Sequence, residues 1–292
     1  MTQTAGIVSI DGHLTPPDEA KISVFDRGFL YGDSVYETVR VYRGAPFALE
    51  IHLERLRRSG SRIGFALPWS DPELSRQIAQ ALTAAALGDA YLRIIATRGQ
   101  GTLGIDPGLA ADPRLLIFVL PLPAIPQRVY DEGRSAALVS VQRNHKRAMD
   151  PDTKTGNYMN SVLAQGEATR LQAEEAIMLD HQGRVAEAST ANVFAWVDDR
   201  WCTPPLEVGL LDGITRRTIL NLCQRHDVPA EERVLWPDDL RSAPEIFVCS
   251  SMREVVPIVR LDGAPVGLGT VGERVPRIHQ LYREEVRKRT GP

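Results

Sequence analysis

Three prolines within six residues, Pro121-Leu122-Pro123-Ala124-Ile125-Pro126, constrain the fold of this chain more than any other stretch. Proline lacks the backbone N–H that a helix or a central strand needs, so this segment favours a stiff, extended linker. The 292 residues are enough for two modest domains. We therefore expect a small N-terminal domain over residues 1–120, a linker over 121–133 and a larger C-terminal domain over 134–292.

The residues before the linker predict strands mixed with helices. Residues 35–42 alternate in side-chain type, which is typical of a half-buried strand. Asp26 to Asp33 is punctuated by glycine and predicts a loop. We expect strands at 7–10, 21–25, 35–42, 91–97 and 114–120, and helices opening at His52 and covering about 72–87.

The residues after the linker repeat this mixture without a regular strand–helix–strand alternation. The expected strands cover 136–141, 176–179, 184–188, 193–197 and 245–249, and the expected helices run from about 157 to 171, up to about 225, and from 273 to 288. Such a pattern predicts a mixed α/β (α+β) fold rather than a doubly wound parallel sheet.

Composition argues against several classes of function. A formal net charge of -3 gives no electrostatic reason to bind nucleic acid or an anionic membrane, and no apolar run has the length of a membrane span. The first residues lack the basic and apolar regions of a signal peptide. Three dispersed cysteines predict reduced thiols in a cytoplasm, and six histidines without metal-ligand spacing predict no metal site.

One lysine stands out in the stretch Asp152 to Asn160. Lys154 precedes an apparent helix start, and Tyr158 follows four residues later. Positions four apart share a helix face, so we expect the amine and the phenol to reach one bound object. A lysine that forms an imine must lose its proton near neutral pH, which requires desolvation or a neighbouring cation.

Two further segments have the character of anion sites. Gly213-Ile214-Thr215 stands at an expected helix start, where free N–H groups favour phosphate, and Ser250-Ser251-Met252 follows a strand with two hydroxyl groups. Glu187, at a strand end, is a candidate to face a pyridine nitrogen. Neither a Walker-type phosphate loop nor the G-x-S-x-G elbow of a serine hydrolase occurs.

Six ordered motifs together resemble the class IV (fold type IV) pyridoxal-phosphate aminotransferases, over nearly the whole chain. The motifs are Leu30-Tyr31-Gly32-Asp33-Ser34-Val35-Tyr36-Glu37, His52-Leu53-Glu54-Arg55-Leu56, Lys154-Thr155-Gly156-Asn157-Tyr158, Glu187 with Asn192, Gly213-Ile214-Thr215-Arg216, and Ser250 through Pro257. The resemblance implies a homodimer of two-domain subunits, with pyridoxal 5′-phosphate between the domains.

The same resemblance implies a role for each matched residue. Lys154 would form the imine with the cofactor and later move a proton between substrate and cofactor. Tyr158 would bond the 3′ oxygen, and Glu187 would pair with the pyridine nitrogen. The residues that would hold the ring or the phosphate are Arg55, Leu211, Ile214, Thr215, Ser250 and Ser251. Those that would line the substrate pocket are Tyr31, Tyr36, Arg40, Arg93, Arg98 and Met252.

Substrate choice is less strongly indicated. The glycine-rich loop from Arg98 to Pro107, with Arg40 and Arg93, is most similar to microbial branched-chain aminotransferases, which implies a ping-pong exchange between a hydrophobic amino acid and a 2-oxo acid such as 2-oxoglutarate. Tyr36-Glu37-Thr38 and Met252-Arg253 depart from that pattern. A D-amino acid aminotransferase or (R)-selective amine transaminase is the alternative, an aminodeoxychorismate lyase the third reading, and a catalytically silent cofactor-binding protein the reading from another class.

Overall fold

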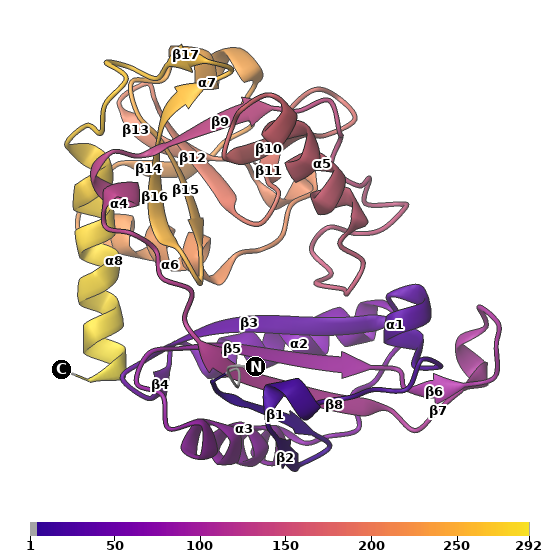
Figure 1. Cartoon of the computed structure of the whole chain (residues 1–292). Coiled ribbons are helices and arrows are strands. Elements are labelled where there is room, and N and C mark those ends of the chain that lie inside the picture. Colours follow the sequence, from indigo (N-terminus) through magenta and orange to yellow (C-terminus); the bar gives the residue numbers. More distant parts are fainter. Residues whose placement is uncertain (1–4, 292) are drawn as a thin grey trace. The chain divides into compact units, whose positions relative to one another are not determined.

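The computed structural model describes residues 5–291, and these form two compact units (Figure 1). The first unit contains the chain up to Pro123, the short segment Thr153–Asn157 and the residues from Lys288. The second contains Ala124–Asp152 and Tyr158–Arg287. The expected domain boundaries at 120 and 134 stay a prediction; the compact units divide at Pro123 and group Lys154 with the first of them.

The first unit is built on an antiparallel sheet that has six strands within the described residues, in the order β2-β1-β8-β5-β3-β4. Its strands are β1 Ile7–Ile10, β2 His13–Thr15, β3 Ser34–Tyr42, β4 Ala45–Pro46, β5 Ala90–Thr97 and β8 Arg114–Pro121. A separate short pair joins β6 Gln100–Gly101 to β7 Ala110–Ala111. The helices are η1 Pro17–Glu19, α1 Arg27–Tyr31, α2 Leu49–Arg62, α3 Asp71–Ala85 and η2 Pro107–Leu109.

The core of the first unit lies between the sheet and the helices α2 and α3. Alternate β3 residues face this core, with Val35, Val39 and Val41 fully buried against Leu56 of α2 and Leu74 of α3. Every second side chain of β3 faces the helices, and the apolar side chains of α2 and α3 recur on the helix faces that cover the sheet. The packing of these two sets of side chains stabilises the layer.

The second unit is built on a mixed sheet with β11-β10-β9-β16-β15-β12-β13-β14 in order and β17 paired to β16. Its strands are β9 Arg134–Leu138, β10 Glu175–Leu179, β11 Val185–Ala188, β12 Asn192–Val197, β13 Arg200–Thr203, β14 Ala230–Glu232, β15 Ile246–Ser250, β16 Glu254–Leu261 and β17 Ala264–Pro265. The helices are α4 Arg128–Asp131, α5 Met159–Arg170, η3 Leu206–Val208, α6 Ile214–Arg225, α7 Pro237–Ser242 and α8 Arg274–Thr290, the last of which belongs to this unit up to Arg287.

The mixture of parallel and antiparallel pairs confirms the mixed α/β class. Strand β9 pairs in parallel with both β10 and β16, whereas β15 and β16 form an antiparallel hairpin. Small side chains let helix α5 approach the sheet closely, since Ala164 and Ala168 are fully buried against Ala176. No helix within residues 5–291 is long and apolar enough to cross a membrane.

Two element predictions were wrong, both near the N-terminus. Residues 21–25 form no strand; the partner of β1 is instead β2, directly after the Asp11-Gly12 turn. Residues 26–33 contain helix α1 rather than only a loop, because Asp26 Oδ1 caps it by accepting from the Gly28 N–H at 2.7 Å and Gly32 ends it at a φ of 67°. Both signals are visible in the sequence, but five helical residues are too few to show periodicity.

Candidate active site

Lys154 lies in an extended segment that is fastened to strand β3 and helix α2. Its backbone N–H donates to Ser59 Oγ at 3.1 Å, and its carbonyl accepts from the Tyr36 N–H at 3.0 Å. The Gly156 N–H donates to the Ser34 carbonyl at 2.9 Å, and a Cβ on Gly156 would stand 2.2 Å from Ser34 Oγ. The segment around the lysine is therefore packed closely on β3, and these hydrogen bonds hold its backbone in place.

The Lys154 amine lies against the ring of Tyr36, with Nζ 4.4 Å from the ring centroid. The Arg93 guanidinium carbon is 4.2 Å from the same centroid. Arg93 Nη1 donates to the Tyr91 hydroxyl at 3.3 Å, while its buried Nε has no hydrogen-bond partner within residues 5–291. The Lys154 amine and the Arg93 guanidinium thus contact the same ring, and the buried Arg93 Nε, which lacks a partner in the described part of the chain, suits this part of the first unit to a carboxylate or phosphate ligand.

A fully buried carboxylate, Glu37, stands behind Arg55. Arg55 Nε donates to Glu37 Oε1 at 2.7 Å and Nη2 donates to Oε2 at 2.8 Å. His52 Nδ1 lies 2.7 Å from Glu37 Oε2. His52 and Arg55 are three residues apart on α2, so both side chains reach the same point of the neighbouring strand.

The charges in this cluster follow from burial and pairing. Burial by itself raises the pKa of Glu37, but Arg55 and His52 outweigh it and hold that pKa well below its usual range. Burial lowers the pKa of His52 below its usual value, although Glu37 opposes the shift. His52 is therefore neutral at pH 7, and Nδ1 carries its proton because an ionised carboxylate can only accept.

In the second unit, Glu187 is a buried carboxylate held by three donors. Arg143 Nε donates to Oε1 at 2.7 Å, and Oε2 accepts from the Leu211 N–H at 3.1 Å and from Asn192 Nδ2 at 3.3 Å. Arg143 Nη1 also donates to Asn160 Oδ1 at 3.1 Å. These contacts stabilise the ionised form of Glu187, which is the form needed opposite a protonated ring nitrogen.

Helix α6 begins at Ile214 with no side chain capping its first N–H groups. A Cβ on Gly213 would stand 1.9 Å from Asn192 Oδ1, so a larger residue at this helix start would displace the Asn192 side chain. The Asp212 N–H donates to Asp152 Oδ1 at 3.0 Å, and Ile214 and Thr215 are buried just beyond. The helix therefore presents backbone donors and a positive dipole end in the way that phosphate sites do.

The turn between β15 and β16 contains Ser251 and Met252 and is held by its neighbours. Ser250 Oγ accepts from the Arg253 N–H at 3.4 Å. Arg253 pairs with the buried carboxylate of Glu175 through Nη1, and its Nη2 donates to Thr190 Oγ1 at 3.0 Å. The extra cation expected beside this turn is therefore compensated by a protein carboxylate within its own unit.

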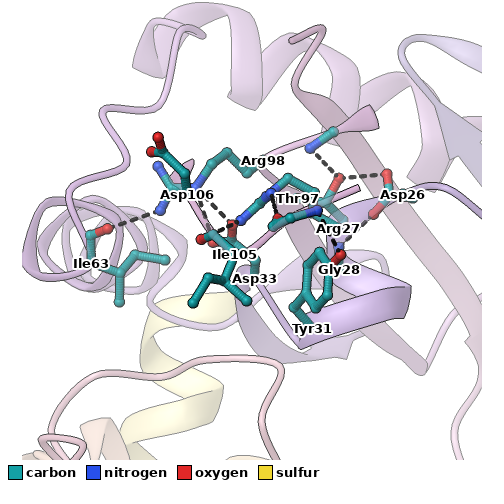
Figure 2. Close-up of polar contacts among 12 residues, drawn as sticks. Asp26, Arg27, Gly28, Tyr31, Asp33, Ile63, Thr97, Arg98, Ile105 and Asp106 are labelled. Atoms are coloured by element: carbon teal, nitrogen blue, oxygen red, sulfur yellow. Dashed lines mark hydrogen bonds and ion pairs between the residues drawn. The ribbon is translucent and has the colours of Figure 1, made fainter. Parts of the chain in front are cut away.

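Figure 2 shows how the predicted pocket residues Tyr31 and Arg98 are used in the first unit. Arg98 Nε donates to Asp33 at 2.9 Å, and its Nη1 and Nη2 donate to the Gly64 and Ile63 carbonyls. The Tyr31 hydroxyl accepts from the Gly104 N–H at 3.2 Å. Both side chains thus support the glycine-rich loop after β5.

Arg27 completes the support of this loop. Its Nε donates to Asp33 at 2.8 Å, and Nη1 and Nη2 donate to the Gly104 and Ile105 carbonyls at 2.8 and 3.2 Å. Burial by itself raises the pKa of Asp33, but Arg98 and Arg27 outweigh it and lower that pKa below its usual value. The ionised carboxylate of Asp33 therefore binds two arginines (Figure 2). Through Arg27 it connects α1 to the loop, and through Arg98 it connects to the carbonyls at the end of α2.

The structure brings the predicted residues together in two sets, one in each unit. Lys154, Tyr36 and Arg93 meet directly in the first unit, and Arg55 and Arg40 lie on the elements around them, Arg40 over the ring of Tyr42 at 4.6 Å. The second unit joins Glu187 to Leu211 and contains the other predicted cofactor residues, which are Tyr158, Ile214, Thr215, Ser250 and Ser251, together with Met252.

The expectation that Lys154 and Tyr158 share a helix face was wrong. Helix α5 begins at Met159, with Tyr158 as its N-cap, so neither residue lies inside the helix. Lys154 instead follows the edge of β3, where Thr155 forms a bridge with Val35. Residue spacing by itself therefore says nothing about how the amine and the phenol are placed.

Three supporting residues were absent from the predicted site: Glu37, His52 and Arg143. Glu37 and His52 stand inside recognised motifs, and the signal for Glu37 was a charged residue in a row of valines. Arg143 opens the polar loop before Lys154, and nothing in its local sequence indicates a contact with Glu187 forty-four residues later.

Comparison with known proteins decides the family. The model of the family described as amino-transferase class IV matches residues 34–261, most of the chain. The chain belongs to the class IV aminotransferases. It is therefore a transaminase, and the enzymes of this family use pyridoxal 5′-phosphate.

Several relatives match nearly the whole length of the chain. A protein of Methanocaldococcus jannaschii named as a putative branched-chain-amino-acid aminotransferase is 33% identical over 277 residues, 95% of each chain. A D-alanine aminotransferase of Bacillus licheniformis is 29% identical over 97% of this chain and 98% of its own. The branched-chain aminotransferase structure from Escherichia coli matches with a TM-score of 0.93 at 28% identity, over 98% of this chain and 96% of that one.

The residues of each unit fit the cofactor that the family uses. A carboxylate at Glu187 that accepts from Arg143, Asn192 and the Leu211 N–H matches a protonated pyridine nitrogen, and the start of α6, which has no side-chain cap, matches a phosphate. A lysine amine on an aromatic face matches an aldehyde-binding residue.

Proposed function

We propose that this transaminase exchanges the amino group between a hydrophobic, branched-chain-like amino acid and a 2-oxo acid such as 2-oxoglutarate, by a ping-pong mechanism. The observation that carries the proposal is the Arg93 guanidinium on the Tyr36 ring, which the Lys154 amine also contacts. An apolar donor has one carboxylate and 2-oxoglutarate has two, so the Arg93 guanidinium on this ring would favour the second carboxylate of the dicarboxylate acceptor. The branched-chain relative and structures support the donor class.

The cofactor supplies an aldehyde that binds amines and a ring that accepts electrons from the substrate. Lys154 would hold the cofactor covalently and then carry the proton released from the substrate Cα. Tyr158 would bond the ring oxygen, and Glu187 would keep the ring nitrogen protonated. The groups that would hold the phosphate are the guanidinium of Arg55, the N–H groups of Ile214 and Thr215, and Ser250 and Ser251, with Leu211 against the ring.

The substrate would be oriented by the pocket around Tyr36. The N–H groups of Ser251 and Met252 would bind the α-carboxylate, because Arg253 is already paired with Glu175. Arg40 and Arg93 would set side-chain preference, and Tyr31 and Arg98 would act through the loop that they hold (Figure 2). The active unit would be a homodimer, and its three buried cysteines suit the reducing cytoplasm.

A specific observation favours a second donor class. Relatives named D-alanine aminotransferase reach 31% identity over 96% of this chain, and Tyr36-Glu37-Thr38 resembles that subgroup. D-amino acids or (R)-amines are therefore the alternative donors. The lyase reading is the third, and it differs by releasing pyruvate without an acceptor.

A half-reaction screen separates these readings. The purified yellow enzyme is mixed with L-leucine, L-valine, D-alanine or an (R)-amine, and cofactor absorbance is followed before and after 2-oxoglutarate is added. We expect the L-amino acids to bleach the colour and 2-oxoglutarate to restore it. Bleaching by D-alanine alone would transfer the assignment to the second class, and colour without any bleaching would identify a silent binder.

A further inference from the structure

One charged residue interrupts the core-facing row of strand β3. The row consists of Val35, Glu37, Val39 and Val41, and the three valines are fully buried in the apolar core of the first unit. Glu37 is buried to the same extent, with 0% of its surface exposed. A carboxylate at such a position needs an explanation, because a fourth valine would fill the row at no cost in desolvation.

Pairing by itself does not explain Glu37. Replacing a buried ion pair by apolar residues is often neutral or stabilising, so the Glu37–Arg55 pair is weak evidence for a gain in stability. Its geometry is informative instead, since two parallel N–H···O contacts fix the plane of the Arg55 guanidinium. His52 adds a third contact to the carboxylate from the same helix face.

We propose that Glu37 and His52 are positioning residues, which fix the Arg55 guanidinium in the orientation that binds the cofactor phosphate. The inference rests on the proposed role of Arg55. Neutral His52 donates a hydrogen bond that fixes the orientation of the Glu37 carboxylate without adding a charge. The carboxylate in turn fixes the orientation of the Arg55 guanidinium. The two residues act on the phosphate only through Arg55.

A competing electrostatic effect has the opposite sign. The negative charge of Glu37 partly cancels that of Arg55, so its removal by itself would strengthen phosphate binding. In the Glu37→Gln variant, however, the new amide N–H faces an arginine N–H, and one of the two parallel contacts becomes a donor–donor clash. The guanidinium must then turn away. Orientation and charge therefore predict opposite changes in phosphate affinity.

The experiment compares pyridoxal 5′-phosphate with pyridoxal, which lacks the phosphate. Both are titrated into apoenzyme of the parent, Glu37→Gln, Arg55→Lys and the double variant, with binding read from cofactor absorbance. We expect Glu37→Gln to weaken the phosphorylated cofactor by about tenfold and to leave pyridoxal within about twofold. The Arg55→Lys variant already lacks the two parallel N–H groups of the guanidinium. In that background, Glu37→Gln should weaken binding of the phosphorylated cofactor by less than a further factor of about two.

The outcomes separate the inference from the proposed function. If Arg55→Lys leaves the ratio of the two affinities unchanged, the paired N–H groups of the Arg55 guanidinium do not bind the phosphate, and the proposed role of that guanidinium is wrong. If Arg55→Lys changes the ratio but Glu37→Gln leaves it unchanged or tightens the phosphorylated cofactor, the positioning role is wrong. Equal weakening of both ligands would show a structural role only, which also overturns it.

Two further variants control for folding. Glu245→Gln removes a buried carboxylate that caps helix α8 through Arg274 and the Val275 N–H, so it tests the loss of a buried acid without touching Arg55. We expect it to leave the affinity ratio unchanged. His52→Gln keeps a donor toward Glu37 and should shift the ratio in the same direction as Glu37→Gln but by less, about threefold. No shift with a folded His52→Gln would exclude His52 from the positioning role.

Discussion

Two glutamate–histidine–arginine clusters, one in each unit, have the same composition and different surroundings. In the first, Glu37, His52 and Arg55 are 0%, 1% and 3% exposed. In the second, Glu254 accepts from His279 Nε2 at 2.6 Å and Arg283 Nε at 3.0 Å, but the arginine side chain is 47% exposed. Burial of the cation therefore distinguishes the two.

The second cluster fastens a hairpin to a helix. Glu254 follows the β15–β16 turn with a φ of 58°, a left-handed conformation that costs a non-glycine residue about 1 kcal/mol or more. His279 stacks on Tyr130 with ring centroids 4.7 Å apart, and both His279 and Arg283 lie on helix α8. The Arg283 guanidinium stays in contact with water, so its charge carries only a small desolvation penalty.

We call the buried cluster of Glu37, His52 and Arg55 the dry cluster. Its difference from the cluster of Glu254, His279 and Arg283 indicates why its arginine is buried. Arg55 is held away from water by an ion pair that gains little stability, so its buried charge is better explained by a ligand than by the fold. Arg283 needs no such explanation. The following predictions test that distinction, beginning with the largest effect.

Loss of the acid should cost more stability in the dry cluster. Glu37→Gln leaves the buried Arg55 without its counter-charge and should lower the free energy of unfolding by about 3 kcal/mol. Glu254→Gln frees an arginine that can return to water and should cost about 1 kcal/mol. Urea denaturation of both variants measures the two values, and equal losses would remove the distinction.

Loss of the arginine should affect cofactor binding in one cluster only. Arg55→Ala removes charge-assisted bonds to phosphate and should weaken pyridoxal 5′-phosphate by about 100-fold. Arg283→Ala should leave the affinity within about twofold of the parent. The absorbance titration reports both, and a comparable loss in Arg283→Ala would contradict the assignment.

Acidification should destabilise the dry cluster through His52. Its pKa is lower in the folded protein than the ordinary value of 6.5, so below that pH the unfolded chain binds more protons and stability falls as pH decreases. The lowered pKa of Glu37 extends the loss below its ordinary value of 4.5. The unfolding free energy should fall by at most about 1.4 kcal/mol per pH unit for each group.

The matched measurement is a series of denaturation curves between pH 7 and 5 on the parent and on His52→Gln. The variant should lose less stability over this interval than the parent. A parallel decline in both proteins would show that His52 does not contribute to the pH dependence.

The smallest effect belongs to the exposed arginine. Arg283→Ala should lower the unfolding free energy by less than about 1 kcal/mol, because water already solvates half of that side chain. The cost should decrease further between about 0.05 and 0.5 M salt, since screening weakens exposed pairs. A cost that is large and independent of salt would place Arg283 with the dry cluster.

The sequence predicted those features that depend on local pattern. The alternation in 35–42 identified β3, and the helix expected over about 72–87 corresponds to α3. Motif order identified the family. Local pattern failed where partners are distant, as for Arg143 and Glu187, or where an element is very short, as for α1, α4 and α7.

The half-buried strand expected at 35–42 also shows what a local pattern does not predict. Tyr36 and Tyr42 point away from the valine row and are nevertheless buried, because Arg93, Lys154 and Arg40 cover their rings. An alternating pattern predicts two different faces, but it does not reveal that long cations cover the polar one.

The most direct test of the account is to locate the cofactor on the chain. The sequence has four lysines, Lys21, Lys146, Lys154 and Lys288, so borohydride reduction of the yellow enzyme followed by peptide mass spectrometry gives an unambiguous answer. We predict that the pyridoxyl mass appears on Lys154, and that prior bleaching with L-leucine prevents its attachment. Attachment to Lys146 or another lysine, or attachment that L-leucine does not prevent, would contradict the central claim.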